Sequence, residues 1–378
     1  MWGLLKWLWF AVSGKRILWI AAMRDAVGAR NAGDFAASAQ HFKLAYDIMR
    51  GCFGVNDLRT ATAANSLSHA YEKIGKYDDA ERLHKDALAA AEKCCPADSP
   101  KLIVFLNGLG VIYSKRGRHD DAEPLYRRML HIYELHPDTR QVGLSDCYVN
   151  LGNVHRSRGK FADAKQMYVR ALGIYERYFG ADSPYRASVL NNLCSVSIHL
   201  NAMEDAENYA NQALASRKAA LGNDHPDLVP VLNNLGEVYR HQKRYQEARS
   251  VFEQAVKICE SRLGPDNDRL ASPLTNLAAV LCQTDELERA EALCDRAIAI
   301  REKILGKSHT YLSASYRVKA NIQAKRQNSE AAEKYYRHAI SMAKFPEIKE
   351  IVKDFGAFLR EHNRAPEAEE VERKAVPV

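Results

Sequence analysis

The sequence repeats itself at a fixed interval, and this interval constrains the fold more than any other feature. An alanine followed within a few residues by an aromatic or apolar residue returns every 42 residues, at Ala80, Ala122, Ala164, Ala206, Ala248, Ala290 and Ala332. Periods of about 20 to 50 residues are typical of solenoids, in which each unit buries its apolar face against its neighbours. The chain of 378 residues is therefore expected to form one stacked array, although its length alone would suggest two or three separate domains.

Each unit contains two apolar patterns with spacings of three and four residues. The clearest unit has them at Leu232, Leu235, Gly236 and Tyr239, and again at Ala248, Phe252 and Ala255. This spacing predicts two amphipathic helices in each unit. Gly75, Gly117 and Gly159 stand between the two patterns, where a left-handed helix cap is expected. The sequence thus predicts an all-α, right-handed superhelical solenoid of helix pairs.

The small and aromatic positions of this unit resemble the tetratricopeptide repeat, whose usual length is about 34 residues. The longer unit here carries spacers at 179–184, 221–226 and 263–266 and the motif Leu-Asn-Asn-Leu at 190–193 and 232–235. Together they are similar to the repeats of kinesin light chain, over residues 60 to 345. No heptad segment for pairing with a heavy chain is found. The resemblance implies a protein-interaction scaffold that has no chemistry of its own.

Three regions are expected along the chain. Residues 1–20 form an apolar, tryptophan-rich segment, residues 21–345 an array of about eight helix pairs, and residues 346–378 a shorter capping repeat. In this last unit Glu372 occupies the aromatic position, and a charge there suits a unit on which no further repeat packs.

The N-terminal segment holds all four tryptophans of the chain, which are Trp2, Trp7, Trp9 and Trp19. Twelve helical residues would cover about 18 Å, which is short of a hydrocarbon core of about 30 Å. Two interpretations remain open. The segment either caps the first repeat, or it anchors the protein at a membrane interface, with tryptophans at headgroup depth and Lys15 and Arg16 facing anionic lipid.

Asparagines recur one residue before a leucine in the first helix of four consecutive units, at Asn150, Asn192, Asn234 and Asn276. First helices line the concave wall of such a solenoid, and an amide can pair with both the N–H and the C=O of an extended peptide. The kinesin light chain resemblance implies that these asparagines hold a peptide and, less firmly, that Asn65, Asn107, Asn191 and Asn233 do so as well. The alternative is that they form hydrogen bonds within the wall.

Basic residues and histidines recur at the end of the same helices, at Lys73, Lys115, Arg156, His199, Arg240 and His241. If they face the groove, they favour an acidic partner. The alternative is that they complement the helix dipole in solvent. A net charge of +7 without a Lys/Arg tract does not indicate nucleic acid, and none is expected as a partner.

No catalytic motif is present. Gly306-Lys307-Ser308 ends like a phosphate loop, but Arg301 stands where the first glycine is required. The eight cysteines form no C-x-x-C pair, and the histidines are dispersed. His225 and His309 are expected to cap turns, and Cys194 and Cys294 to be core thiols. No enzyme activity, cofactor or metal is therefore expected.

The sequence favours a cytoplasmic, non-enzymatic scaffold that binds an extended, acidic peptide in its concave groove. A membrane-associated assembly or recruitment factor, anchored by the N-terminal segment and with a peripheral membrane contact, is the alternative. An accessory subunit of a separately encoded enzyme is a third hypothesis.

Overall fold

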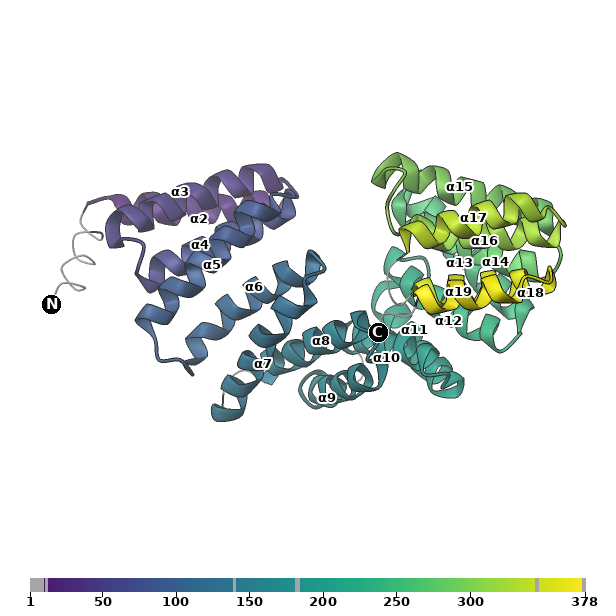
Figure 1. Cartoon of the computed structure of the whole chain (residues 1–378). Helices are drawn as coiled ribbons and strands as arrows, with labels where there is room; N and C mark the ends of the chain where they lie inside the picture. Colours follow the sequence, from purple (N-terminus) through teal and green to yellow (C-terminus); the bar gives the residue numbers. More distant parts are fainter. Residues whose placement is uncertain (1–9, 11–12, 139–140, 181–183, 344–346, 376–378) are drawn as a thin grey trace. The chain divides into compact units, whose positions relative to one another are not determined.

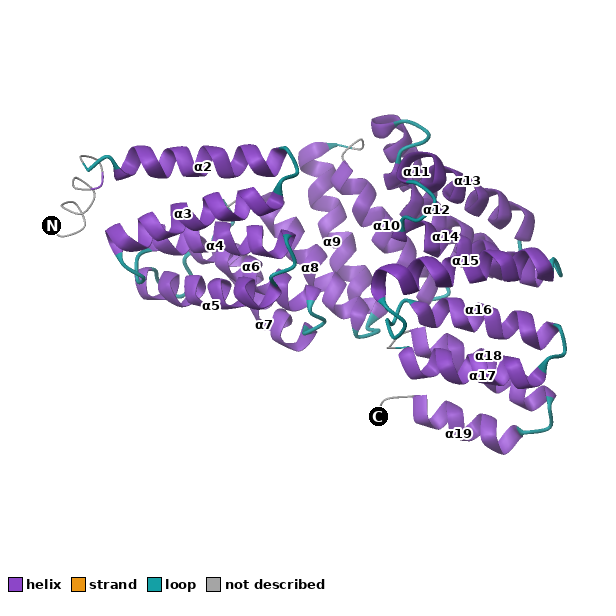
Figure 2. Cartoon of the chain, turned by 90° about the horizontal axis from the view of Figure 1, so that it is seen from above, coloured by secondary structure: helices purple, strands orange, loops and turns teal. Residues whose placement is uncertain are grey.

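The computed structural model describes residues 10, 13–138, 141–180, 184–343 and 347–375. Within these ranges all regular structure is helical, with 18 α-helices and two short 3-10 turns (Figures 1 and 2). The prediction of an all-α solenoid of helix pairs is confirmed. The chain divides into two compact units, Met1–Val154 and His155–Val378.

The first unit contains three complete helix pairs (Figure 1). Their helices are α2 (Lys15–Asn31), α3 (Phe35–Phe53), α4 (Leu58–Lys73), α5 (Tyr77–Cys94), α6 (Ile103–Lys115) and α7 (His119–Leu135). Helix α8 (Gln141–Ser157) crosses the boundary between the two units.

The second unit begins with α9 (Phe161–Phe179), which packs on α10, and continues with five helix pairs. Their helices are α10 (Pro184–His199), α11 (Met203–Leu221), α12 (Val229–His241), α13 (Tyr245–Leu263), α14 (Asp268–Gln283), α15 (Leu287–Leu305), α16 (Leu312–Lys325), α17 (Ser329–Met342), α18 (Glu347–Glu361) and α19 (Ala365–Ala375). The first helices of consecutive pairs also pack on one another, so α10, α12, α14, α16 and α18 form one continuous wall.

Two pairs, α6 with α7 and α12 with α13, close by setting an aromatic ring of the second helix against a glycine of the first. A Cβ atom on Gly236 would lie 2.5 Å from the ring of Phe252, and one on Gly110 would lie 2.7 Å from the ring of Tyr126. Both rings are almost fully buried. The small residue therefore provides the space that the aromatic side chain fills, as its spacing in the sequence predicts.

Glycines also follow the helix ends at positions where the sequence predicts a turn. Gly75 follows α4 with φ +75°, and Gly222 follows α11 with φ +85°. Only glycine adopts such backbone angles without a steric cost, so these positions fix where the chain reverses direction.

At the N-terminal end, Trp19 lies on α2 and packs edge-on against Phe10 with ring centroids 6.5 Å apart; Phe10 in turn contacts Phe53 of α3. Trp2, Trp7 and Trp9 lie outside the described residues. The helix pairs already begin at Lys15, inside the segment 1–20 that the sequence set apart. No helix among the described residues is long and apolar enough to cross a membrane.

The last pair, α18 and α19, ends the array with a charge in its aromatic position. The carboxylate of Glu372 occupies the space beside Gly356 that a ring fills in other units, and it pairs with Arg360 at 2.7 Å. The capping role of residues 346–378 stays a prediction.

Candidate functional site

A groove in the second unit is lined by asparagines from three consecutive first helices. It has a volume of about 440 Å³ and is formed by α10, α12 and α14 together with Arg156, Arg301 and Ala314. Its amide side chains are those of Asn191, Asn192, Asn233, Asn234 and Asn276. We call this hollow the asparagine groove. The 42-residue interval places these amides in register because the three helices lie side by side.

The amides are only partly used within the wall. Asn234 donates from Nδ2 to the side-chain oxygen of Asn191 at 2.9 Å and to its backbone oxygen at 3.2 Å. The side-chain amides of Asn192 and Asn276 form no hydrogen bond with the described residues, and the Oδ1 of Asn233 is buried without a partner. An amide such as that of Asn234 can therefore form a hydrogen bond with an amide of the preceding repeat, such as that of Asn191. The other amides keep their donors and acceptors open to the groove.

Arg301 adds a buried positive charge to the groove. Its residue is 6% exposed, and its guanidinium donates to the hydroxyls of Ser315 at 2.6 Å and Ser272 at 2.9 Å, with a longer contact to Thr275 at 3.4 Å. No carboxylate of the described chain lies within ion-pair distance, and burial lowers the pKa of Arg301. A buried cation without an anionic partner is costly, and it is a ready receptor for an anion.

Sequence analysis missed Arg301 as a groove residue. There it counted only as a mismatch to a phosphate-loop motif, because it lies on α15, the second helix of its pair. Only the packing of α15 behind α14 brings its guanidinium to the wall that the first helices form. Together with Arg156, it gives the asparagine groove two cations and no lining carboxylate. Such a set of cations, hydroxyls and amides is suited to binding carboxylates along an extended chain.

The helix ends next to the groove carry less free positive charge than the sequence suggests. Arg240 lines a second hollow of about 270 Å³, and there it pairs with Glu237 of its own helix at 2.6 Å. Helix α18 brings Glu350 and Asp354 to the same hollow, where they lie 3.6 and 3.5 Å from Arg317. The chain's own carboxylates thus compensate much of the predicted basic rim here.

The two rim histidines are neutral at pH 7. Burial and the neighbouring charge of Arg156 lower the pKa of His199, whose ring stacks on Phe161 at 4.2 Å. Burial and Arg240 likewise lower the pKa of His241. Neither ring therefore adds to the positive potential at neutral pH.

The first unit contains the remaining predicted residues. Asn150 donates from Nδ2 to Oδ1 of Asn107 at 3.1 Å, which is the same kind of bond that Asn234 makes with Asn191. Lys73 lies exposed at the end of α4, whereas Lys115 pairs with Glu72 at 2.6 Å. Asn65 is buried and bonds His84, so it cannot face a ligand in an open groove.

Glu72 also contacts two histidines, His69 and His84. These three side chains could hold a metal ion, although the sequence shows none of the usual metal-binding motifs. The only local signal is the spacing of His69 and Glu72 by three residues on one helix face, since His84 comes from the next helix.

The two histidines and two cysteines that the sequence analysis singled out have structural roles. His225 and His309 accept backbone N–H groups through Nδ1, as expected for capping residues. Cys194 and Cys294 are fully buried, and burial raises the pKa of each thiol to about 12. Such thiols are inert core residues.

Models of the tetratricopeptide repeat match residues 26–93, 103–136, 143–219, 185–261 and 269–344, which is well over half of the chain. No curated protein matches the sequence.

Among solved structures, the chain is similar to a Rap protein complexed with competence and sporulation factor, at 13% identity and a TM-score of 0.68, over 94% of this chain and 96% of that one. It is equally similar to the apo form of the quorum sensor NprR from B. thuringiensis, at 13% identity and a TM-score of 0.68, over 96% and 98% of the two chains. BtubC (BKLC) from P. vanneervenii matches at 24% identity and a TM-score of 0.48, over 66% of this chain and 91% of that one. The two longer matches show the same helical repeat fold.

Proposed function

Because the chain belongs to the tetratricopeptide repeat family and is a protein-interaction scaffold, we propose that its asparagine groove holds an extended peptide that carries carboxylate groups. The tetratricopeptide repeat family was predicted from the sequence, and it is confirmed. Repeats of this fold are generally non-enzymatic.

The observation that carries the proposal is Arg301, a buried guanidinium held by hydroxyls alone. A carboxylate of the peptide supplies the missing negative charge and accepts hydrogen bonds from Arg301 or Arg156. The open amides of Asn192 and Asn276 pair with the peptide backbone. Backbone pairing then provides affinity along the chain, and the cations provide the preference for acidic residues.

The groove differs from the predicted basic rim in one important respect. At the rim, Arg240 and Arg317 already face carboxylates of the chain itself. Arg301 has no such partner among the described residues, so an acidic ligand gains more by binding there than at the rim. The preference for an acidic peptide is therefore assigned to the asparagine groove.

The test compares labelled extended peptides that contain Asp and Glu with matched peptides that contain Asn and Gln, using fluorescence anisotropy on the full chain. The acidic set is expected to bind more tightly. Arg301→Met should reduce this preference. Asn192→Ala with Asn276→Ala should weaken the binding of both peptide sets, at about 0.5–1.5 kcal/mol for each lost hydrogen bond.

Asn107→Ala is the matched control, because Asn107 holds the same repeat position as Asn191 and does not line the asparagine groove. It should leave peptide binding unchanged. Equal binding of both peptide sets, or an acidic preference that is undiminished in Arg301→Met, would contradict the proposal.

One observation favours a second candidate function, which is association with a membrane surface. The start of α2 exposes Ile17 by 73% and Leu18 by 60%, next to Lys15 and Arg16. Apolar side chains beside cations are suited to an interface with anionic lipid. Pelleting with vesicles that contain phosphatidylserine should then decrease in Ile17→Glu/Leu18→Glu, while unchanged pelleting would reject this candidate.

A further inference from the structure

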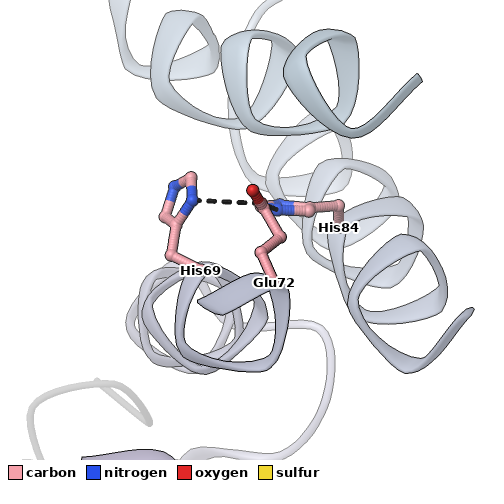
Figure 3. Close-up of side chains that lie close together, drawn as sticks. All are labelled: His69, Glu72 and His84. Atoms are coloured by element: carbon pink, nitrogen blue, oxygen red, sulfur yellow. Dashed lines mark hydrogen bonds and ion pairs between the residues drawn. The ribbon is translucent and has the colours of Figure 1, made fainter. Parts of the chain in front are cut away.

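We propose that His69, Glu72 and His84 form a binding site for a divalent transition-metal ion of the Zn²⁺ class. His69 and Glu72 lie three residues apart on one face of α4, and His84 approaches from α5 (Figure 3). The Oε1 atom of Glu72 lies 3.2 Å from Nδ1 of His69 and 3.0 Å from Nε2 of His84. The three ligand atoms all lie within 4.8 Å of one another.

Two imidazole nitrogens and one carboxylate oxygen are a donor set typical of zinc sites that keep a fourth position open. Bonds of about 2.0–2.2 Å place the ligands of a tetrahedral ion about 3.3 Å apart. Both contacts of Glu72 are already close to this separation. The ligand nitrogens of His69 and His84 lie within 4.8 Å of each other, so binding draws the exposed His69 toward His84.

The surroundings of His84 match those of a metal-bound histidine. Its Nδ1 lies 3.1 Å from Oδ1 of Asn65, and its Nε2 faces the carboxylate of Glu72. A neutral ring carries one proton, which it donates either from Nδ1 to Asn65 or from Nε2 to Glu72. In the first tautomer the lone pair of Nε2 points at a carboxylate oxygen and is repelled by it. A cation between these two atoms turns that repulsion into coordination, and Asn65 then fixes the tautomer as ligand-supporting carbonyls do.

Gly108 of α6 makes room for this arrangement. A Cβ at this position would lie 2.6 Å from Cε1 of His84 and 2.8 Å from Oδ1 of Asn65. In the second unit the equivalent positions hold asparagines of the groove, such as Asn192. The first unit thus has a glycine at a position where a Cβ atom would displace the His84–Asn65 pair.

The cluster is closed on one side and open on the other. The side chains of His84 and Glu72 are 0% and 3% exposed, whereas that of His69 is 47% exposed. Solvent therefore reaches the fourth position from the side of His69. Lys115 donates a hydrogen bond to the other carboxylate oxygen of Glu72 at 2.6 Å. Its positive charge repels a metal ion bound at the first oxygen.

The experiment titrates the full, chelator-treated chain with Zn²⁺ alone, in a Cys94→Ser/Cys95→Ser background that removes its exposed or half-exposed thiols. We expect one site, and its affinity should fall at least about tenfold in His69→Ala, as for the loss of a metal-supporting group. His69 carries the test because it is exposed and its loss leaves the core intact. His131→Ala, which removes another exposed histidine of the first unit, is the matched control.

A second variant separates a metal site from a polar network that only stabilises the fold. Lys115→Gln removes the competing cation, so Zn²⁺ affinity should rise, and Co²⁺ should give the absorption bands of a four-coordinate ion. Equal Zn²⁺ affinity in His69→Ala and in the background chain would overturn the proposal, as would no rise in Lys115→Gln. The site lies in the first unit, so this outcome is independent of peptide binding in the asparagine groove.

Discussion

The Nδ2 of Asn234 donates to Oδ1 of Asn191 at 2.9 Å, and this bond joins two repeats through residues 43 positions apart. Asn150 and Asn107 make the same bond in the first unit. In both cases the asparagine at the second position of one repeat donates a hydrogen bond to the asparagine at the first position of the preceding repeat. An asparagine inside a helix is unfavourable by propensity, and a bond between repeats compensates for it.

This bond predicts coupling between Asn191 and Asn234. In a double-mutant cycle of Asn191→Ala and Asn234→Ala, the coupling in the free energy of unfolding should be about 0.5–1.5 kcal/mol, since each single variant already loses the shared bond. Urea unfolding measures it. Strictly additive losses would show that the bond contributes nothing.

Gly236→Ala should destabilise the second unit. The added Cβ would lie 2.5 Å from the buried ring of Phe252, and overpacking of this kind costs about 1–3 kcal/mol. Thermal unfolding followed by circular dichroism measures the loss. Gly173→Ala in α9 is the control, because no atom lies within 4 Å of its added Cβ and alanine favours the helix by about 0.5–1 kcal/mol. Phe252→Leu should partly rescue Gly236→Ala; equal stability of both glycine variants would refute the close packing.

Arg301→Met should separate stability from binding. Removing a buried, uncompensated cation is expected to leave the free energy of unfolding unchanged or to raise it by up to about 4 kcal/mol. The buried hydroxyls of Thr275 and Ser315 keep each other as partners at 2.9 Å, and Ser272 is exposed to solvent. Chemical denaturation measures the change. A loss above about 1 kcal/mol would mean that the guanidinium mainly holds the fold together.

Stability should fall as the pH decreases below about 6.5. Burial lowers the folded-state pKa of His241, and the charge of Arg240 lowers it further, against the raising effects of Glu237 and Glu350. The unfolded chain therefore takes up protons first, near pH 6.5, and the stabilisation present above that pH is lost on acidification. Urea unfolding between pH 7.5 and 5.5 measures this slope.

His241→Gln should make that pH dependence shallower, because glutamine does not titrate. His131→Ala provides the comparison, because it removes an exposed histidine of the first unit. An unchanged slope in His241→Gln would assign the acid sensitivity to other groups.

The sequence by itself determined the architecture. The 42-residue interval, the glycine and aromatic positions and the Gly-ended helices are local signals, and each fixes a contact or a turn within one or two repeats. The recurrence of asparagines likewise predicted which amides would share a wall, because equal spacing in a stacked array places equal positions side by side.

Tertiary structure alone decided how charge is distributed. Arg301 reaches the groove from a second helix, Glu350 and Asp354 compensate the rim from α18, and His84 meets Glu72 from a neighbouring helix. These contacts join residues that do not occupy equivalent positions in the repeat. Side-chain reach and burial determine whether a charge is paired, and both depend on packing between helices, which the spacing of residues along the chain does not specify.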